Sequence, residues 1–186
     1  ICSYYRRIVA TLRKNNTEKY LRHFAENVIK RGKQILRAKG KEGKLSDSLK
    51  YRLEATSKGY NLIFKGADYA TFVDKGVSGT KTTRTYHNVF GKRERSPFKY
   101  TNKQPPASAL DKWIVRKNLK GTRDEKGRFV SRKSLQYLIA RSIKSKGLAA
   151  SSFFSKPMSI ELAKFDNGIL EAFKTDILTH FETIEL

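Results

Sequence analysis

The side chains of this 186-residue chain that could perform chemistry are three histidines and a few neighbouring carboxylates. The histidines, spread over different segments without the spacing of a zinc site, are His23, His87 and His180. Asp68 and Asp74 lie six residues apart, a separation that a nuclease could use to hold a divalent metal. Asp124 and Glu125 form a second candidate pair. Neither pair has the strands that flank such sites, and helix capping by Asp68 and turn formation by Asp124 explain them more simply.

Motifs for nucleotide binding and for nucleophilic catalysis are missing from the sequence. No Gly-x-x-x-x-Gly-Lys-[Ser/Thr] string occurs, which excludes a P-loop. Gly76-Val77-Ser78-Gly79 is one residue too short for a nucleophile elbow and lies in a polar segment. We therefore expect no catalytic residue, no metal ligand and no cofactor, and a protein that is not an enzyme. The remaining enzymatic alternative is a nuclease whose Mg²⁺-dependent cleavage would be lost on Asp68→Ala or Asp74→Ala.

Positive charge is the more informative feature. Lysine and arginine number 40 against 17 acidic residues, which gives a formal net charge of +23 and an isoelectric point near 10.2. This excess exceeds what solubility requires, so we expect an acidic partner. Residues 157–186 carry six acids against two lysines, a net −4 that leaves +27 on residues 1–156. This acidic arm could dock on the basic body of its own chain or of a neighbouring copy, or it could be an ordinary solvated helix face.

Much of the basic charge gathers in Val77–Gln104, a segment with few aliphatic residues. The cations that we expect to meet DNA or an acidic partner are Lys81, Arg84, Lys92, Arg93, Arg95 and Lys99. The aromatic residues that interleave with them, as in surfaces that combine phosphate contacts with base stacking, are Tyr86, Phe90, Phe98 and Tyr100. No recognition helix or RNP-type pattern supports sequence-specific binding. The alternative is a protein–protein loop that closes on an acidic neighbour and uses its aromatics as anchors.

The elements that must position these side chains begin with helices. Apolar residues recur at helical spacing over residues 4–38, and Asn15-Asn16-Thr17-Glu18 interrupts them. This pattern predicts a short helix, a break and an amphipathic helix of about twenty residues, with Asn16 or Thr17 as its N-cap and Gly40 as its stop.

A β-hairpin and further helices are expected downstream. Leu49–Ala55 and Tyr60–Phe64 alternate apolar and polar side chains around the turn Thr56–Gly59, which predicts a hairpin. The other expected elements are a short helix over Tyr69–Val73, a helix over Ala107–Leu119, a basic turn around Lys126-Gly127, a helix from Leu135 closed by Gly147, and a long helix after Pro157 with a kink or break at Gly168. Together they predict an α+β fold, a long N-terminal helix packed on a small antiparallel sheet, with additional helices and a long basic loop.

Cysteine use and hydropathy bound the setting of the protein. Cys2 is the one cysteine, so no disulfide can form within the chain, which fits a reducing compartment. No apolar run approaches the roughly 18–20 residues that cross a membrane. We expect a protein without a membrane segment that is made in the cytoplasm.

Short motifs follow one another in a distinctive order over residues 17–160. Gly43-Lys44-Leu45-Ser46-Asp47-Ser48-Leu49 fits Gly-x-Leu-x-x-Ser-[Ile/Leu], and Tyr69–Gly76 fits Tyr-Ala-x-x-Val-Glu-x-Gly with Asp74 in place of Glu. The later motifs are a Pro-led helix from Pro106 to Trp113, Ile139-Ala140-Arg141-Ser142-Ile143 with Gly147-Leu148, and Phe153-Phe154. This order resembles the neck and tail-completion (head-tail connector) proteins of tailed bacteriophages, and we expect the later motifs to pack against the earlier ones.

Two features depart from that family. The insertion Val77–Gln104 is longer and more basic than in its compact members, and Ser151-Ser152 replaces the usual Pro before the Phe pair. By the resemblance, we expect an N-terminal extension at residues 1–16, an α+β domain at 17–156 that includes the insertion at 77–104, and an acidic helical arm at 157–186. Trp113, Phe153 and Phe154 are expected to pack the core or to anchor subunit contacts.

The resemblance implies a structural virion protein without catalysis. Members of the family form rings in the phage neck that join the portal to the tail around the DNA exit channel. We therefore expect a homo-oligomeric ring of six or twelve copies, assembled in the host cytoplasm, that contacts portal or adaptor proteins, tail proteins and packaged DNA. In such a ring the acidic arm of one copy would lie on the basic body of the next. The alternative is a non-sequence-specific DNA- or RNA-binding protein that is packaged with the genome or acts on it.

Overall fold

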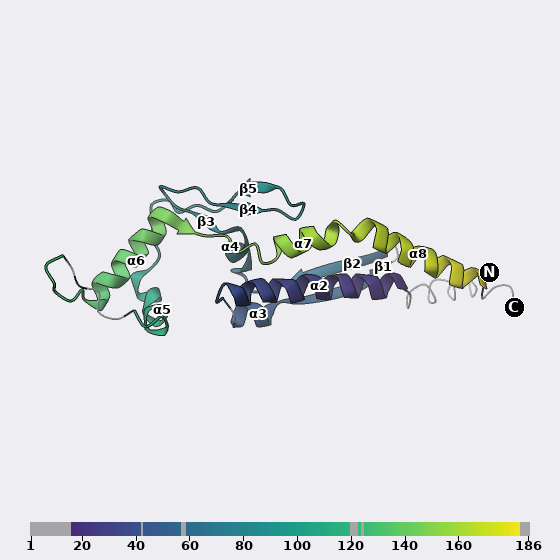
Figure 1. Cartoon of the computed structure of the whole chain (residues 1–186), viewed down its shortest axis with the longest axis horizontal. Helices are drawn as coiled ribbons and strands as arrows, with labels where there is room; N and C mark the ends of the chain where they lie inside the picture. The colour runs from purple at the N-terminus through teal and green to yellow at the C-terminus, as the bar shows by residue number, and fades with distance from the viewer. Residues whose placement is uncertain (1–15, 42, 57–58, 120–122, 124, 183–186) are drawn as a thin grey trace. The chain divides into compact units, whose positions relative to one another are not determined.

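A computed structural model describes residues 16–41, 43–56, 59–119, 123 and 125–182 of the chain, with side chains up to residue 179 (Figure 1). The chain divides into two compact units. The first comprises residues 1–70, 87–92 and 152–186, and the second comprises residues 71–86 and 93–151. Helices and small antiparallel sheets confirm the predicted α+β class. The short helix predicted before Asn16 lies outside the described residues.

The first unit is built around the long helix α2, Asn16–Ala38 (Figure 1). Its buried residues recur at helical spacing and so form one stripe. They are Leu21, Phe24, Ala25, Val28, Gly32 and Leu36. Gly40 follows with a φ of 59°, and Lys41 N donates to Leu36 O over 2.9 Å, a Schellman ending. The predicted amphipathic helix and its glycine stop are both confirmed.

A hairpin packs on α2 in the first unit, as predicted. Strands β1 (Lys50–Thr56) and β2 (Gly59–Lys65) are antiparallel, with Leu53 opposite Leu62. The short helix α3, Lys44–Ser48, precedes β1. Ser48 Oγ accepts a hydrogen bond from Ala67 N over 2.9 Å, so the Ser of the first motif binds the backbone two residues before the second motif.

The acidic arm packs on α2 of its own chain as two helices, α7 (Ser155–Leu162) and α8 (Phe165–Glu182). Figure 1 shows α8 running alongside α2. The ring of Phe165 meets that of Phe24 edge-on, with centroids 5.1 Å apart. Of the docking surfaces considered for the acidic arm, the structure shows the one on its own chain.

Two buried carboxylates of the arm supply the polar part of this contact. Glu161 Oε1 lies 2.9 Å from Arg31 Nε on α2. Asp176 accepts hydrogen bonds from the backbone N–H groups of Asn16 (2.8 Å) and Thr17 (3.0 Å) and from the Thr17 hydroxyl (2.6 Å). The first N–H groups of a helix lack partners within it, so a carboxylate 160 residues away caps α2. Neither acid is available to a neighbouring copy.

The predicted break at Gly168 is wrong, because α7 and α8 meet at residues 163–164 and Gly168 lies inside α8. A Cβ at Gly168 would collide with the ring of Tyr20 on α2. The glycine leaves room for the Tyr20 ring between the two helices, a role that no local pattern reveals.

Among its described residues, the second unit holds short strands and four helical segments. Most of α4 (Ala70–Lys75) belongs to it, and the elements that follow are β3 (Val77–Ser78), β4 (Thr85–His87), β5 (Arg93–Arg95), the 3₁₀ helix η1 (Ala107–Leu110), α5 (Asp111–Arg116), α6 (Arg132–Lys146) and β6 (Gly147–Leu148). In place of the single predicted sheet, the described residues form three two-stranded sheets, β1–β2, β3–β6 and β4–β5. The insertion predicted as a loop therefore carries a hairpin of its own.

The helices of the second unit follow the prediction in part. Helix α6 begins after Ser131, whose side chain accepts from Ser134 N, and ends at Gly147 with a φ of 71°. The helix predicted over Ala107–Leu119 is instead η1 followed by α5. The helix predicted over Tyr69–Val73 lies slightly later, as α4. Among the helices of the described residues, none has the length and apolarity that a membrane crossing requires.

Candidate functional site

The basic insertion is anchored at the C-terminal end of α6. The last four carbonyl groups of a helix receive no hydrogen bond from an N–H group of the helix itself. All four are bonded here, and three of the bonds come from the insertion. The N–H of Gly147 donates to the Ile143 carbonyl. From the insertion, the N–H of Thr80 donates to Lys144 O over 2.9 Å, and the N–H of Lys81 donates to Ser145 O over 3.0 Å. Arg84 Nε donates to Lys146 O over 2.9 Å. These hydrogen bonds fix the base of the insertion to the end of α6.

Two glycines allow this close approach. A Cβ at Gly79 would collide with the Ser145 carbonyl, and a Cβ at Gly147 would collide with the carbonyl of Val77 across the β3–β6 pair. Ser78 precedes Gly79, lies opposite Gly147 in the β3–β6 pair and is buried. Its hydroxyl accepts from Arg84 N over 3.0 Å, which holds the start of the hairpin in place.

The hairpin β4–β5 presents two chemically different faces. Ser96 N donates to Arg84 O over 2.9 Å, which sets Tyr86 opposite Glu94, and the Tyr86 hydroxyl donates to Glu94 Oε2 over 2.9 Å. Successive side chains of a strand point to opposite sides. Arg93 and Arg95 therefore share the face away from Glu94, and both are exposed. Two neighbouring guanidinium groups of this kind suit phosphates or carboxylates.

The six predicted cations divide into two kinds. Lys81, Lys92, Arg93, Arg95 and Lys99 are exposed. Arg84 is only partly exposed, and its Nε is committed to Lys146 O. Its guanidinium is thus part of the scaffold, where a cation at a helix C-terminus is favourable. Arg93 Nε also binds the Thr85 hydroxyl over 3.0 Å, which orients the side chain.

Most of the aromatic residues predicted to stack with bases are occupied within the second unit. Tyr86 is buried, with Lys75 Nζ 5.4 Å from its ring centroid. Its burial, its hydrogen bond to Glu94 and the charges of Glu94 and Asp74 raise the pKa of Tyr86. Phe98 packs on Phe72, with ring centroids 4.3 Å apart.

The two remaining aromatics differ from each other. Burial raises the pKa of Tyr100, whose side chain is partly covered. Phe90 is highly exposed. The stacking role predicted for the set therefore fits Phe90 alone.

The acids and histidines do not gather into a metal site. Among the described residues, no three side chains of His, Cys, Asp or Glu lie in an arrangement that could hold a metal. Asp74 is buried on α4, whereas Asp68 precedes that helix. His23 and His87 are exposed on separate elements. Asp124 and the side chain of His180 lie outside the described residues.

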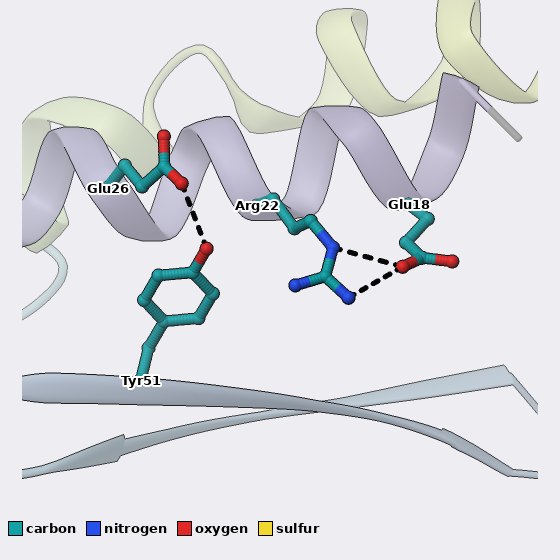
Figure 2. Close-up of polar contacts among 4 residues, drawn as sticks. All are labelled: Glu18, Arg22, Glu26 and Tyr51. Atoms are coloured by element: carbon teal, nitrogen blue, oxygen red, sulfur yellow. Dashed lines mark hydrogen bonds and ion pairs between the residues drawn. The ribbon is translucent and has the colours of Figure 1, made fainter. Parts of the chain in front are cut away.

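A polar cluster between α2 and β1 also has a structural role (Figure 2). The Tyr51 hydroxyl donates to Glu26 Oε1 over 3.0 Å, and Arg22 donates through Nε and Nη2 to Glu18 over 2.9 and 2.7 Å. Burial and the bond to Glu26 raise the pKa of Tyr51, with Arg22 acting in the opposite direction. The phenol therefore stays protonated and joins the hairpin to the helix.

The three predicted packing residues fall in different environments. Phe153 is fully buried, and its carbonyl would lie 2.8 Å from a Cβ at Gly32, so a side chain on α2 would displace it. The ring of Phe154 packs edge-on against Phe64, with centroids 5.2 Å apart. Trp113 is 40% exposed, which leaves subunit contact as its predicted role.

The later motifs pack against the earlier ones, as predicted. Val77 pairs with Leu148, and a Cβ at Gly76 would lie 2.7 Å from Leu148 O. Ser151 is buried and donates both its N–H (2.9 Å) and its hydroxyl (2.6 Å) to Val73 O. A proline at 151 would remove both bonds, and the φ of 50° at Ser152 is closed to proline. The departure Ser151-Ser152 thus has a physical reason.

Sequence reasoning missed the apolar residues that the folded chain leaves exposed. On α8 they are Leu170, Phe173, Ile177 and Leu178, and on the second unit they include Val115, Leu119, Phe129, Tyr137 and Leu138. The sequence of α8 did indicate such exposure, because its apolar residues are spread over more than one face of the helix.

Comparison of this chain with protein-family models, with curated proteins and with solved structures finds no match in any of the three. The function therefore has to be argued from the chain itself.

Proposed function

We propose that this protein is a non-catalytic assembly protein of a tailed bacteriophage, which forms a ring of six or twelve copies in the neck and joins the portal to the tail around the DNA exit channel. The resemblance of the ordered motifs suggests the family. The observation that supports it most is the packing of later motifs on the second one: a Cβ at Gly76 would lie 2.7 Å from Leu148 O, and Ser151, which precedes the Phe pair, donates to Val73 O.

The surfaces of the two units are consistent with this proposal. Exposed apolar residues lie on α8 in the first unit and on α5 and α6 in the second. Such residues in number are typical of proteins that bind other proteins. The exposed arginines of β5 supply a surface for DNA or for an acidic neighbour.

The mass of the purified protein, measured by light scattering at moderate salt with and without duplex DNA, tests the proposal. We expect a closed ring of six or twelve copies without DNA. A protein that stays monomeric without DNA and gains mass only when DNA is added would contradict it. That result would favour the second candidate, a non-sequence-specific nucleic-acid-binding protein.

The second candidate is favoured by one observation, the exposure of Arg93 and Arg95 on the same face of β5. If this face binds DNA, Arg93→Ser with Arg95→Ser should lower the slope of log K against log salt by about two, since each phosphate contact contributes about one. A matched control removes two exposed arginines of the first unit, Arg22 and Arg52, and should leave the slope unchanged. An unchanged slope in both variants would contradict DNA binding by this face.

A further inference from the structure

Helix α8 leaves apolar side chains exposed on the side that α2 does not cover. Its contacts with α2 involve Phe165, Gly168 and Asp176. Three other apolar side chains of α8 recur at intervals of three and four residues away from these contacts, so they form one stripe along the helix. This α8 stripe comprises Leu170 (63% exposed), Phe173 (51% exposed) and Ile177 (37% exposed).

The chain enters α2 directly beside the α8 stripe. The N–H of Asn16, the first residue of α2, donates to Asp176 over 2.8 Å. Phe173 precedes Asp176 by three residues, so the two side chains are neighbours on the surface of α8. Residues 1–15 are therefore attached to the first unit at one end of the stripe.

The sequence of residues 1–15 has the pattern of an amphipathic helix. Apolar side chains recur at intervals of three, one and three residues, which places them on one face of a helix. They are Tyr5, Ile8, Val9 and Leu12. The four cations of the segment fall outside this face and are Arg6, Arg7, Arg13 and Lys14. The apolar face spans seven residues, as the α8 stripe does, and seven residues of helix measure about 10 Å.

Covalent attachment favours this segment over other occupants of the stripe. A partner joined by a short stretch of chain has an effective concentration of roughly millimolar, well above that of a second copy in dilute solution. Charge makes no such selection, because exposed Asp166 and Lys174 both lie beside the stripe and offset each other. Apolar contact and attachment together therefore indicate the occupant.

We propose that residues 1–12 dock on the α8 stripe of their own chain, with Tyr5, Ile8 and Leu12 against Leu170, Phe173 and Ile177. The whole contact lies within the first unit. The inference goes beyond the proposed ring and does not require it. It takes the stripe out of the surfaces that another copy can use, and leaves the exposed apolar residues of α5 and α6 for that role.

Paired substitutions in the segment test the contact. Ile8→Ser with Leu12→Ser should speed hydrogen exchange at positions 166–178 by about tenfold, because the stripe loses its cover. The control Arg7→Ser with Lys14→Ser alters the opposite side of the same segment and should leave exchange there unchanged. Circular dichroism checks that both variants keep their helices. Exchange that neither pair alters, or that both pairs accelerate equally, would overturn the inference.

A photo-cross-link from Cys2 identifies what the segment docks on. Cys2 is the one cysteine of the chain and lies three residues before Tyr5, so it can carry a benzophenone without any substitution. Isotopically light and heavy chains are unfolded in urea, mixed, refolded and irradiated. We expect links to the tryptic peptide between Lys164 and Lys174, each joining segments of the same isotopic kind.

The other outcomes of the cross-link contradict the inference. A link between a light and a heavy chain would show that the segment docks on another copy. A link to α5 or α6 would show that it docks on the second unit. The absence of any link to α8 would leave the stripe without this cover, and each of these three results would overturn the inference.

Discussion

Each of the two units of this protein is stabilised internally by a different kind of interaction. The first unit buries a run of apolar side chains, among them Phe24, Val28, Leu36 and Phe153, beneath two helices and a hairpin. The second buries few, and its insertion is fixed by hydrogen bonds to the end of α6. The first unit therefore has a hydrophobic core that is covered by its own elements. The second resembles a part that gains stability when a partner covers its exposed helices.

The largest effect should come from the core of the first unit. Phe153→Ala should lower the free energy of unfolding by about 3–5 kcal/mol, because a fully buried ring leaves a cavity that Gly32 and its neighbours cannot fill. Urea denaturation measures the loss. The exposed Trp113 of the second unit is the control, and Trp113→Ala should cost less than about 1 kcal/mol at low protein concentration. Equal losses in both variants would refute the difference between the units.

A local effect of about 2 kcal/mol or more is expected at the glycine that joins α6 to the insertion. Gly147→Ala combines a left-handed φ with a collision against Val77 O. Hydrogen exchange should therefore speed up around residues 77–82 and leave α2 unchanged. Gly127 also has a positive φ but open space around it, so Gly127→Ala is the matched control and should cost only about 1 kcal/mol. Loss of protection in α2 would mean that the two units unfold as one.

The carboxylate cap of α2 should be worth less. Asp176→Ala removes three hydrogen bonds at the start of the helix and should cost about 1–2 kcal/mol, typical of a lost N-cap. Thermal unfolding measures it. The exposed Glu171 of the same helix is the control, and Glu171→Ala should be near neutral. If both variants behave alike, the cap does not stabilise α2.

The smallest effect is a pH dependence in the second unit. The pKa of Tyr86 is raised on folding, so the neutral phenol contributes stability that is complete below its ordinary pKa of about 10 and is lost as pH rises through the higher folded value. Tyr86→Phe should cost about 1 kcal/mol at neutral pH, from the lost bond to Glu94, and should show a smaller decline above pH 10. Parallel declines in both proteins would contradict this account.

The sequence predicts the local elements well and the long-range contacts poorly. The stripe of α2, its stop at Gly40, the hairpin and α6 follow from spacing and turn residues, which act within a few positions. The cap by Asp176 and the collision that fixes Gly168 depend on residues about 150 positions away. No local pattern contains such information.

The candidate site was predicted unevenly for the same reason. Charge alone identifies Arg93 and Arg95, which the structure places together on one exposed face. Charge also selected Arg84, whose guanidinium binds a helix end. The aromatic pattern misled because Tyr86 and Phe98 are covered by Lys75 and Phe72, partners that become neighbours only in the folded chain.

Hydrogen exchange at low and at high protein concentration tests most directly the claim that the exposed helices of the second unit are covered by another copy. At high concentration we expect protection to rise around residues 134–141, while the core positions 25–36 of α2, already covered within the chain, stay unchanged. An exchange pattern that does not depend on concentration, or that changes equally everywhere, would contradict the account.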